Sequence, residues 1–214
     1  MLKVDHLTIG YDSRALVRDI SFELAPGECV LLAGPNGTGK TTLLKWLASG
    51  EAAVVLIPTN IPKVKGFTVE AFVRTGCYRE SDWRGRISKE VEGRMEEALK
   101  MLGIEGLKGR DISTLSDGEF QKACLATGLT RRAEVLLLDE PTAHLDVENR
   151  IDVLRTLREV ARKTGTAVLF SSHDLHDALQ VADRVFVLTR DGRFLASAGT
   201  DVLRAAFPAL ANLL

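Results

Sequence analysis

One stretch, residues 30–44, constrains the fold of this chain more than any other, and it reads VLLAGPNGTGKTTLL. Its apolar start predicts a buried strand, and Leu43, Leu44 and Leu47 predict one face of a following helix. Between them, residues 34–41 fit the pattern G-x-x-x-x-G-K-[ST]. A plain glycine-rich turn is the alternative, but strand, loop and helix are the context that this pattern requires.

The residue types in the loop suit a polyphosphate. Gly34, Gly37 and Gly39 allow main-chain N–H groups to point inward and to approach phosphates closely. The N-terminus of the next helix adds unpaired N–H donors and a partial positive charge. Lys40 can reach the β- and γ-phosphates, and the Thr41 hydroxyl can hold Mg²⁺.

Composition narrows the class of protein. A chain of 214 residues forms one large domain, or a domain with a subdomain. The net charge of −1 gives no basic field, so we expect no nucleic-acid partner. Cys29, Cys77 and Cys124 are far apart, which predicts small buried side chains and no zinc site. We expect no signal peptide and no membrane-spanning run, so a membrane role requires a partner protein.

Hydrophobic patterning predicts a doubly wound α/β fold with a mainly parallel sheet and its ligand at the carboxyl edge. An N-terminal hairpin precedes the phosphate-loop strand, and an Asp191-Gly192 turn predicts a second hairpin near the end. The expected strands are 2–10, 20–24, 30–33, 53–57, 135–138, 167–170, 185–188 and 194–198. The expected helices after the phosphate loop are 68–75, 88–102, 116–130, 149–163, 175–181 and 201–206.

Three further places carry candidate chemistry, each with a plainer alternative. Asp139 and Glu140 end a buried strand, where Asp139 can hold Mg²⁺ and Glu140 can face an attacking water; both can instead cap the next helix. Ser116 and Glu119 fit a capping box, and the same helix start can bind an anion. Tyr11 can stack on an adenine or simply pack at a strand end.

Taken together, the motifs resemble the nucleotide-binding subunit of an ATP-binding-cassette (ABC) transporter. GPNGTGKTT, LSDGE, LLLDEPTAHLD and SSHDL match the family's phosphate loop, signature loop, Walker B strand with D-loop, and switch histidine, in that order. The resemblance implies a single ABC ATPase domain over 1–214 with a P-loop NTPase (RecA-like) core and a reduced antiparallel β-subdomain. Within it, 1–65 and 133–214 are the nucleotide-binding core, and 66–132 is an inserted helical subdomain.

The resemblance also implies residue roles, with ATP and Mg²⁺ bound between two chains. The catalytic residues are Lys40, Glu140 and His173. The residues that hold the metal are Thr41, Asp139 and Thr59. The ATP-binding residues are Tyr11, Gly34, Pro35, Asn36, Gly37, Thr38, Gly39, Lys40, Thr41 and Thr42. The signature residues Ser116, Asp117, Gly118 and Glu119 face the ATP of the partner chain, and Asp146 lies in the D-loop.

The implied assembly is a homodimer or heterodimer at the inner face of the cell membrane, with a permease and a substrate-binding protein. TVEAFVRTGCY, TLSDGEFQK and SSHDLHDALQVADRV are most similar to importers of iron chelates, haem or cobalamin. The alternatives are a haem-type exporter and a soluble, non-transport ATPase such as one for iron–sulfur assembly.

Several features depart from the family pattern. Asp117 stands where glycine is usual, and the segment from Thr42 to Thr59 is short. Pro58-Thr59-Asn60 replaces the expected Q-loop glutamine, so Thr59 or Asn60 has to serve in its place. We interpret the lysines at 63–65 as solvated. We interpret Trp83 as packed against the helical subdomain, with a surface facing a permease as the alternative.

Overall fold

A six-stranded sheet forms the centre of the computed structural model, which describes residues 1–11, 14–50 and 53–197. Its strand order is β4-β5-β6-β3-β7-β8, and all neighbours are parallel except β7 and β8. The strands are β3 (Cys29–Ala33), β4 (Val54–Ile57), β5 (Val135–Leu138), β6 (Ala167–Ser171), β7 (Arg184–Leu188) and β8 (Phe194–Ser197). The predicted parallel sheet and terminal hairpin are confirmed, whereas the helix expected at 201–206 lies outside the described residues.

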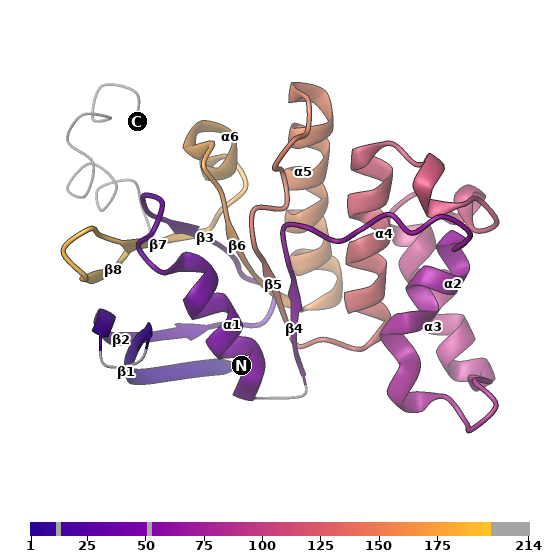
Figure 1. The fold of residues 1–214 in the computed structure, drawn as a ribbon, viewed down its shortest axis with the longest axis horizontal. Helices are drawn as coiled ribbons and strands as arrows, with labels where there is room; N and C mark the ends of the chain where they lie inside the picture. The colour runs from indigo at the N-terminus through magenta and orange to yellow at the C-terminus, as the bar shows by residue number, and fades with distance from the viewer. Residues whose placement is uncertain (12–13, 51–52, 198–214) are drawn as a thin grey trace.

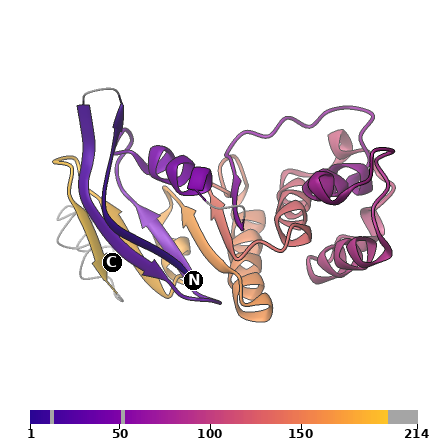
Figure 2. The ribbon, with the colours of Figure 1, turned by 90° about the horizontal axis from the view of Figure 1, so that it is seen from below.

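A small antiparallel sheet and one helix cover one face of this central sheet (Figures 1 and 2). The small sheet consists of β1 (Leu2–Tyr11) and β2 (Arg14–Leu24), and the helix is α1 (Lys40–Gly50). Successive residues of β3 alternate between the two faces, as strand geometry requires. Val30 and Leu32 pack toward α1, and Leu31 and Ala33 pack toward the opposite face.

The opposite face is covered by α5 (Val147–Thr164) and α6 (Leu175–Leu179), with α4 (Asp117–Thr130) packed beside α5. Helix α5 begins two residues before the predicted start at Asn149, because Asp146 is its N-cap and accepts a hydrogen bond from the Asn149 amide. No helix in the described parts of the chain combines the length and apolar character that a membrane span demands.

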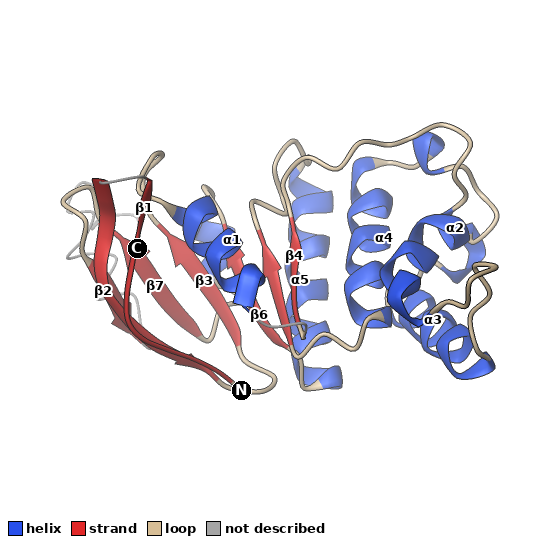
Figure 3. Ribbon diagram, turned by 60° about the horizontal axis from the view of Figure 1, so that its bottom comes forward, coloured by secondary structure: helices blue, strands red, loops and turns tan. Residues whose placement is uncertain are grey.

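The remaining helices gather beyond the β4 edge of the sheet (Figure 3). They are α2 (Val69–Arg74) and α3 (Lys89–Met101), with a 3₁₀ turn at Thr75–Glu80 between them. Two further 3₁₀ turns, Glu105–Leu107 and Ile112–Thr114, lie between α3 and α4. Thr68, Ser88 and Ser116 cap α2, α3 and α4, and the capping box predicted at Ser116 is confirmed. The packing predicted for Trp83 is wrong, because its side chain is 85% exposed, with the Arg84 guanidinium over its ring.

The order of the strands decides where functional side chains meet. Strands β4, β5, β6 and β3 are consecutive neighbours and parallel, so their carboxyl ends lie side by side at one edge. The phosphate loop follows β3, Asp139 and Glu140 follow β5, and His173 follows β6. Residues far apart in the sequence are thereby brought to one edge of the sheet.

Candidate active site

The loop between β3 and α1 is a tight turn built on glycine conformations. Gly37 and Gly39 have φ angles of 81° and 101°, which L side chains rarely adopt. A Cβ on Gly34 would lie 2.6 Å from the Leu188 carbonyl oxygen, so the loop passes too close to β7 for any other residue. The Thr38 hydroxyl closes the loop by donating to the Pro35 carbonyl oxygen at 2.9 Å.

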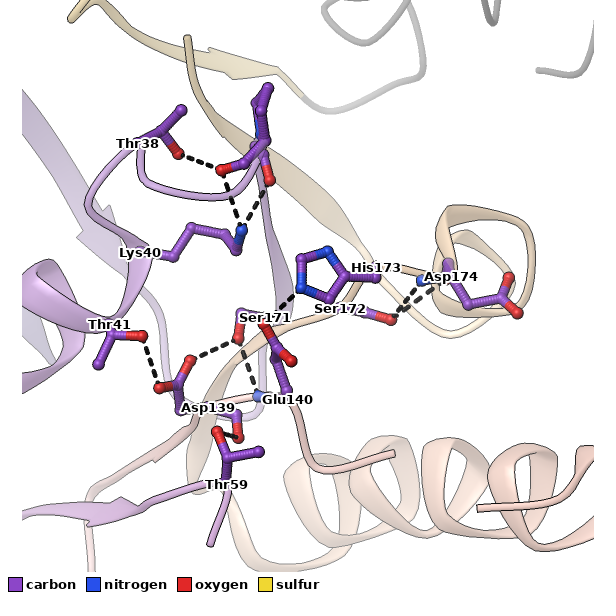
Figure 4. Close-up of polar contacts among 12 residues, drawn as sticks. Thr38, Lys40, Thr41, Thr59, Asp139, Glu140, Ser171, Ser172, His173 and Asp174 are labelled. Atoms are coloured by element: carbon purple, nitrogen blue, oxygen red, sulfur yellow. Dashed lines mark hydrogen bonds and ion pairs between the residues drawn. The ribbon is translucent and has the colours of Figure 1, made fainter. Parts of the chain in front are cut away.

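Lys40 is the first residue of α1 and points back into this loop (Figure 4). Its Nζ donates to the carbonyl oxygens of Gly34 at 2.7 Å and Pro35 at 3.3 Å, and the residue is only 6% exposed. Burial lowers the pKa of Lys40 from its ordinary value of 10.5, while Glu140 and Asp139 act in the opposite direction. The loop thus holds a cation among main-chain groups, beside two carboxylates.

Asp139 connects three strand ends. Its Oδ2 accepts a hydrogen bond from the Thr41 hydroxyl at 2.7 Å, and its Oδ1 accepts one from Ser171 at 3.0 Å. The Asp139 carbonyl oxygen accepts a bond from the Thr59 hydroxyl at 2.8 Å. Asp139 is 7% exposed, so this carboxylate is shielded from bulk water and held on both oxygens (Figure 4).

Glu140 pairs with His173 at the next position along the edge. The Nε2 atom of His173 lies 2.6 Å from Oε1 of Glu140, and the Glu140 amide donates to the Ser171 hydroxyl at 2.9 Å. Glu140 has a φ of 52°, a left-handed conformation that turns its side chain away from the strand direction. Both side chains line a hollow of about 550 Å³, together with His144, Arg150, Asp174 and others.

Tyr11 lies at the end of β1, beside the phosphate loop. Its hydroxyl shares a hydrogen bond of 2.6 Å with the Thr42 hydroxyl, and the residue is 63% exposed. A tyrosine buried in packing would not leave so much of its surface in water. The position leaves Tyr11 available for stacking on a planar ligand next to the loop.

The start of α4 stands apart from this cluster, on the other side of α5 from α1 (Figures 1 and 3). Ser116 Oγ accepts a bond from the Glu119 amide at 3.2 Å, and the Ser116 amide donates to Glu119 Oε2 at 2.8 Å. The amide of Ser116 holds the pKa of Glu119 below its ordinary value of 4.5. Ser116 and Asp117 are exposed and Glu119 is half-buried, whereas Gly118 is buried. Within one chain, this helix start is therefore a separate and partly exposed surface.

Two contacts at the site were not predicted from the sequence. The prediction that Lys63 is solvated is wrong: its side chain is 26% exposed, and its Nζ lies 2.6 Å from Asp117 Oδ1. Ser171 was not singled out, although its hydroxyl touches both Asp139 and Glu140. A polar residue closing the otherwise apolar β6 was the available signal for Ser171.

With this geometry established, the sequence profile of the ABC transporter family matches residues 17–143, more than half of the chain. The chain belongs to the ABC transporter family. Like other members of this family, it is an ATP-binding, ATP-hydrolysing subunit. The family resemblance inferred from the motifs is confirmed.

Two relatives of this ABC ATPase illustrate the similarity. The ferric enterobactin transport ATP-binding protein FepC of Escherichia coli is 32% identical, covering 91% of this chain and 80% of the relative. The zinc import ATP-binding protein ZnuC of Jannaschia sp. is also 32% identical, covering 97% of this chain and 86% of the relative. A solved ABC transporter in an inward-facing conformation superposes with a TM-score of 0.85 at 23% identity, over 96% of this chain and 88% of that one, which confirms the fold.

The donor set of this ABC ATPase fits Mg²⁺. The ion prefers oxygen ligands and is usually held by one or two carboxylates together with substrate phosphates. The Thr41 hydroxyl and the Asp139 carboxylate already lie within hydrogen-bonding distance of each other, beside the phosphate loop. Among the described residues no group of three or more His, Cys, Asp or Glu side chains suits a metal, so phosphates and water would supply the remaining ligands.

Proposed function

We propose that this ABC ATPase powers uptake through a separate membrane permease, and that two ATPase chains sandwich two ATP molecules. The observation that carries the proposal is the convergence of Lys40, Thr41, Asp139, Glu140 and His173 on one sheet edge. The exposed Ser116 and Asp117 stand apart from this cluster at the start of α4. A second chain, identical or related, completes each site with that outward surface.

In this proposal the phosphate loop binds ATP, and each side chain has one task. Main-chain N–H groups of Gly34–Thr42 surround the phosphates, and Lys40 contacts the β- and γ-phosphates. Tyr11 stacks on the adenine. Thr41 and Asp139 hold Mg²⁺, which neutralises phosphate charge when bound. Thr59 stands where the family glutamine is expected, and its bond to the Asp139 carbonyl places it beside the carboxylate.

Hydrolysis follows from the pair of Glu140 and His173. Glu140 accepts a proton from a water whose oxygen attacks the γ-phosphorus, while the bond from that phosphorus to the bridging oxygen breaks and ADP leaves. His173 contacts the γ-phosphate and, through its 2.6 Å contact, orients the Glu140 carboxylate. Ser116–Glu119 of the second chain binds the same phosphate from the other side. In each chain, Asp146 caps the start of α5, beside the signature loop of that same chain.

We also propose that the predicted helical subdomain, residues 66–132, carries the permease contact. Tyr78 and Trp83 are 81% and 85% exposed, which is unusual for large aromatic side chains. They line a hollow of about 580 Å³ with Arg74 and Arg79. A permease loop seated there places the ATPase at the cytoplasmic face of the membrane, and a substrate-binding protein on the far side delivers the cargo.

An iron chelate is the cargo that we propose. The motif resemblance to importers of iron chelates, haem or cobalamin supports this class, as does the name of the ferric enterobactin relative. Zinc is the second candidate, because a zinc import protein is equally similar. The ATPase itself does not contact the cargo, so the choice depends on the permease.

The test is reconstitution in proteoliposomes of the ATPase with a membrane protein encoded beside it. We expect ATP-dependent uptake of radiolabelled ferric siderophore and none with the Glu140→Gln chain. Uptake of zinc in place of iron would overturn the proposed cargo but would agree with the proposed transport mechanism. ATP hydrolysis that no neighbouring membrane protein alters, with no uptake, would overturn the transport proposal.

A further inference from the structure

Lys63 occupies an unexpected place between the β4 edge and the start of α4. Its Nζ lies 2.6 Å from Asp117 Oδ1 and donates to the Leu115 carbonyl oxygen at 2.9 Å. The same ammonium group lies 5.4 Å from the centre of the Phe120 ring. Three contacts on one half-buried side chain fix its position, so this lysine is part of the structure at the helix start.

The partner of Lys63 poses an electrostatic problem for the proposed mechanism. Asp117 is the first residue of α4, and its side chain is 63% exposed. A helix N-terminus attracts anions, but a carboxylate placed there repels a polyphosphate arriving from another chain. Glu119 adds a second carboxylate, although it is turned back onto the Ser116 amide and lies 3.6 Å from Arg110.

We propose that Lys63 is a positioning residue for the signature loop. It neutralises Asp117 and holds the start of α4, so that a loop with aspartate in place of glycine still accepts the phosphates of ATP on a second chain. This inference rests on the dimeric mechanism proposed above and identifies how this chain's loop differs from the usual one.

The surroundings of the loop explain why one side chain has such an effect. On the α5 side, a Cβ on Gly118 would lie 2.6 Å from Asn149 Oδ1, so the two helix starts are in direct contact. Asn149 is itself bonded to both carboxylate oxygens of Asp146, each at 2.8 Å. On the other side Lys63 supplies the restraint. The loop is held between a fixed helix cap and one ion pair.

The segment that carries Lys63 also reaches the ATP site of its own chain. Thr59, four residues earlier, donates to the Asp139 carbonyl oxygen at 2.8 Å. The stretch 59–63 therefore contacts the Walker B strand end with its first residue and the signature loop with its last. A single short segment joins the site that holds ATP to the surface offered to the partner's ATP.

The test uses dimer formation, measured by sedimentation in ATP and Mg²⁺, in the Glu140→Gln background that prevents turnover. Affinity for a fluorescent ATP analogue at low protein concentration reports each chain's own site. We expect Lys63→Ala to weaken dimerisation about tenfold through the exposed carboxylate and to leave nucleotide affinity unchanged. Lys63→Arg should dimerise like the parent. Lys65→Ala changes an exposed lysine two residues further along the chain; it is the matched control and should have no effect.

The decisive variant is the double change Lys63→Ala with Asp117→Gly, because it removes the charge and the need for its partner together. We expect it to dimerise within about twofold of the parent, which a purely structural role for Lys63 does not predict. Undiminished dimerisation of Lys63→Ala, or a double variant no better than Lys63→Ala, would overturn the inference. A parent that binds ATP yet stays monomeric would instead overturn the dimeric mechanism itself.

Discussion

The phosphate-loop region and the signature region are stabilised by opposite means. Lys40, Asp139 and Ser171 are 6%, 7% and 0% exposed, and strand order and main-chain geometry hold them in place. Ser116 and Asp117 are exposed and held by a capping box and an ion pair. The first region is set by the core of the protein, whereas the second depends on charges near the surface.

This difference has a direct consequence for how the two regions respond to change. A buried polar group that loses its partner costs the full desolvation of that group, so substitutions around Asp139 should be severe. Exposed ion pairs contribute little to the free energy of folding and are screened by salt. Substitutions in the signature region should therefore have moderate effects that depend on ionic strength.

Replacing Lys40 with alanine should remove ATP binding. The change deletes the buried cation of the phosphate loop, and we expect affinity to fall by more than about 10³-fold, since buried charged hydrogen bonds are the strong ones. Titration calorimetry measures the loss. Lys45→Ala, on the exposed side of the same helix, is the control and should bind normally. Tight ATP binding by the Lys40→Ala chain would contradict the phosphate-loop assignment.

Replacing Glu140 with glutamine should separate binding from turnover. The variant keeps the size of the side chain but removes the base, so we expect kcat to fall about 10³-fold while ATP affinity is retained. Phosphate release in the steady state measures the rate. The control is Glu134→Gln, directly before the first residue of β5 and at the other end of the strand from Glu140. This variant should hydrolyse ATP like the parent. Full activity in the Glu140→Gln chain would show that another group activates the water.

Ser171→Ala tests the residue that joins Asp139 to Glu140. Loss of its hydroxyl leaves one oxygen of Asp139 and the Glu140 amide without this partner. We expect kcat to fall by about 10- to 100-fold (~2 kcal/mol). Ser172→Ala is matched in burial but removes two bonds to the Asp174 main chain, one donated to its carbonyl oxygen and one accepted from its amide. If both variants lose activity equally, Ser171 has no special role.

Ser116→Ala should cost about 1 kcal/mol of unfolding free energy through the lost cap. Ser88→Ala removes the equivalent cap of α3, so it should cost a similar amount, measured by urea denaturation. The two variants should differ only in ATP-dependent dimerisation, which we expect to weaken for Ser116→Ala alone. Equal dimerisation of both variants would mean that the Ser116 hydroxyl contributes nothing beyond the fold.

The smallest effect concerns the pH dependence of stability at Glu119. Its pKa is held below the ordinary 4.5, chiefly by the Ser116 amide, so its contribution is complete above that pH and is lost as the pH falls through the folded-state pKa. Glu119→Gln should therefore remove roughly 0.3 kcal/mol of acid-sensitive stability. Urea denaturation at pH 6 and at about pH 3.5 measures it. A parent and variant with parallel pH profiles would contradict this role.

Local patterns predicted much of the phosphate loop and the helix starts. The strand, loop and helix around Lys40 and the caps at Ser88 and Ser116 depend on residues close together in the chain, and the structure confirms them. The contact of Glu140 with His173 follows once β5 and β6 are known to be neighbours.

Contacts that depend on strand order or on surface charges were not predictable in the same way. Ser171 reaches Asp139 from 32 residues away because β6 happens to lie beside β5. Lys63 meets Asp117 across 54 residues, and a lysine in a polar loop gives no sign of its partner. Trp83 was expected to pack because large aromatic side chains favour burial, yet the fold leaves it in water.

Strand β6 is central to both halves of the molecule. It lies between β5 and β3, and four of its five residues belong to two separate hydrophobic clusters, with Leu169 in one and Phe170 in the other. Resizing either side chain would shift the ends of three strands relative to one another by small amounts. We expect apolar substitutions in β6 to change the rate of ATP hydrolysis before they prevent folding. Side chains that do not contact ATP can therefore set the catalytic rate.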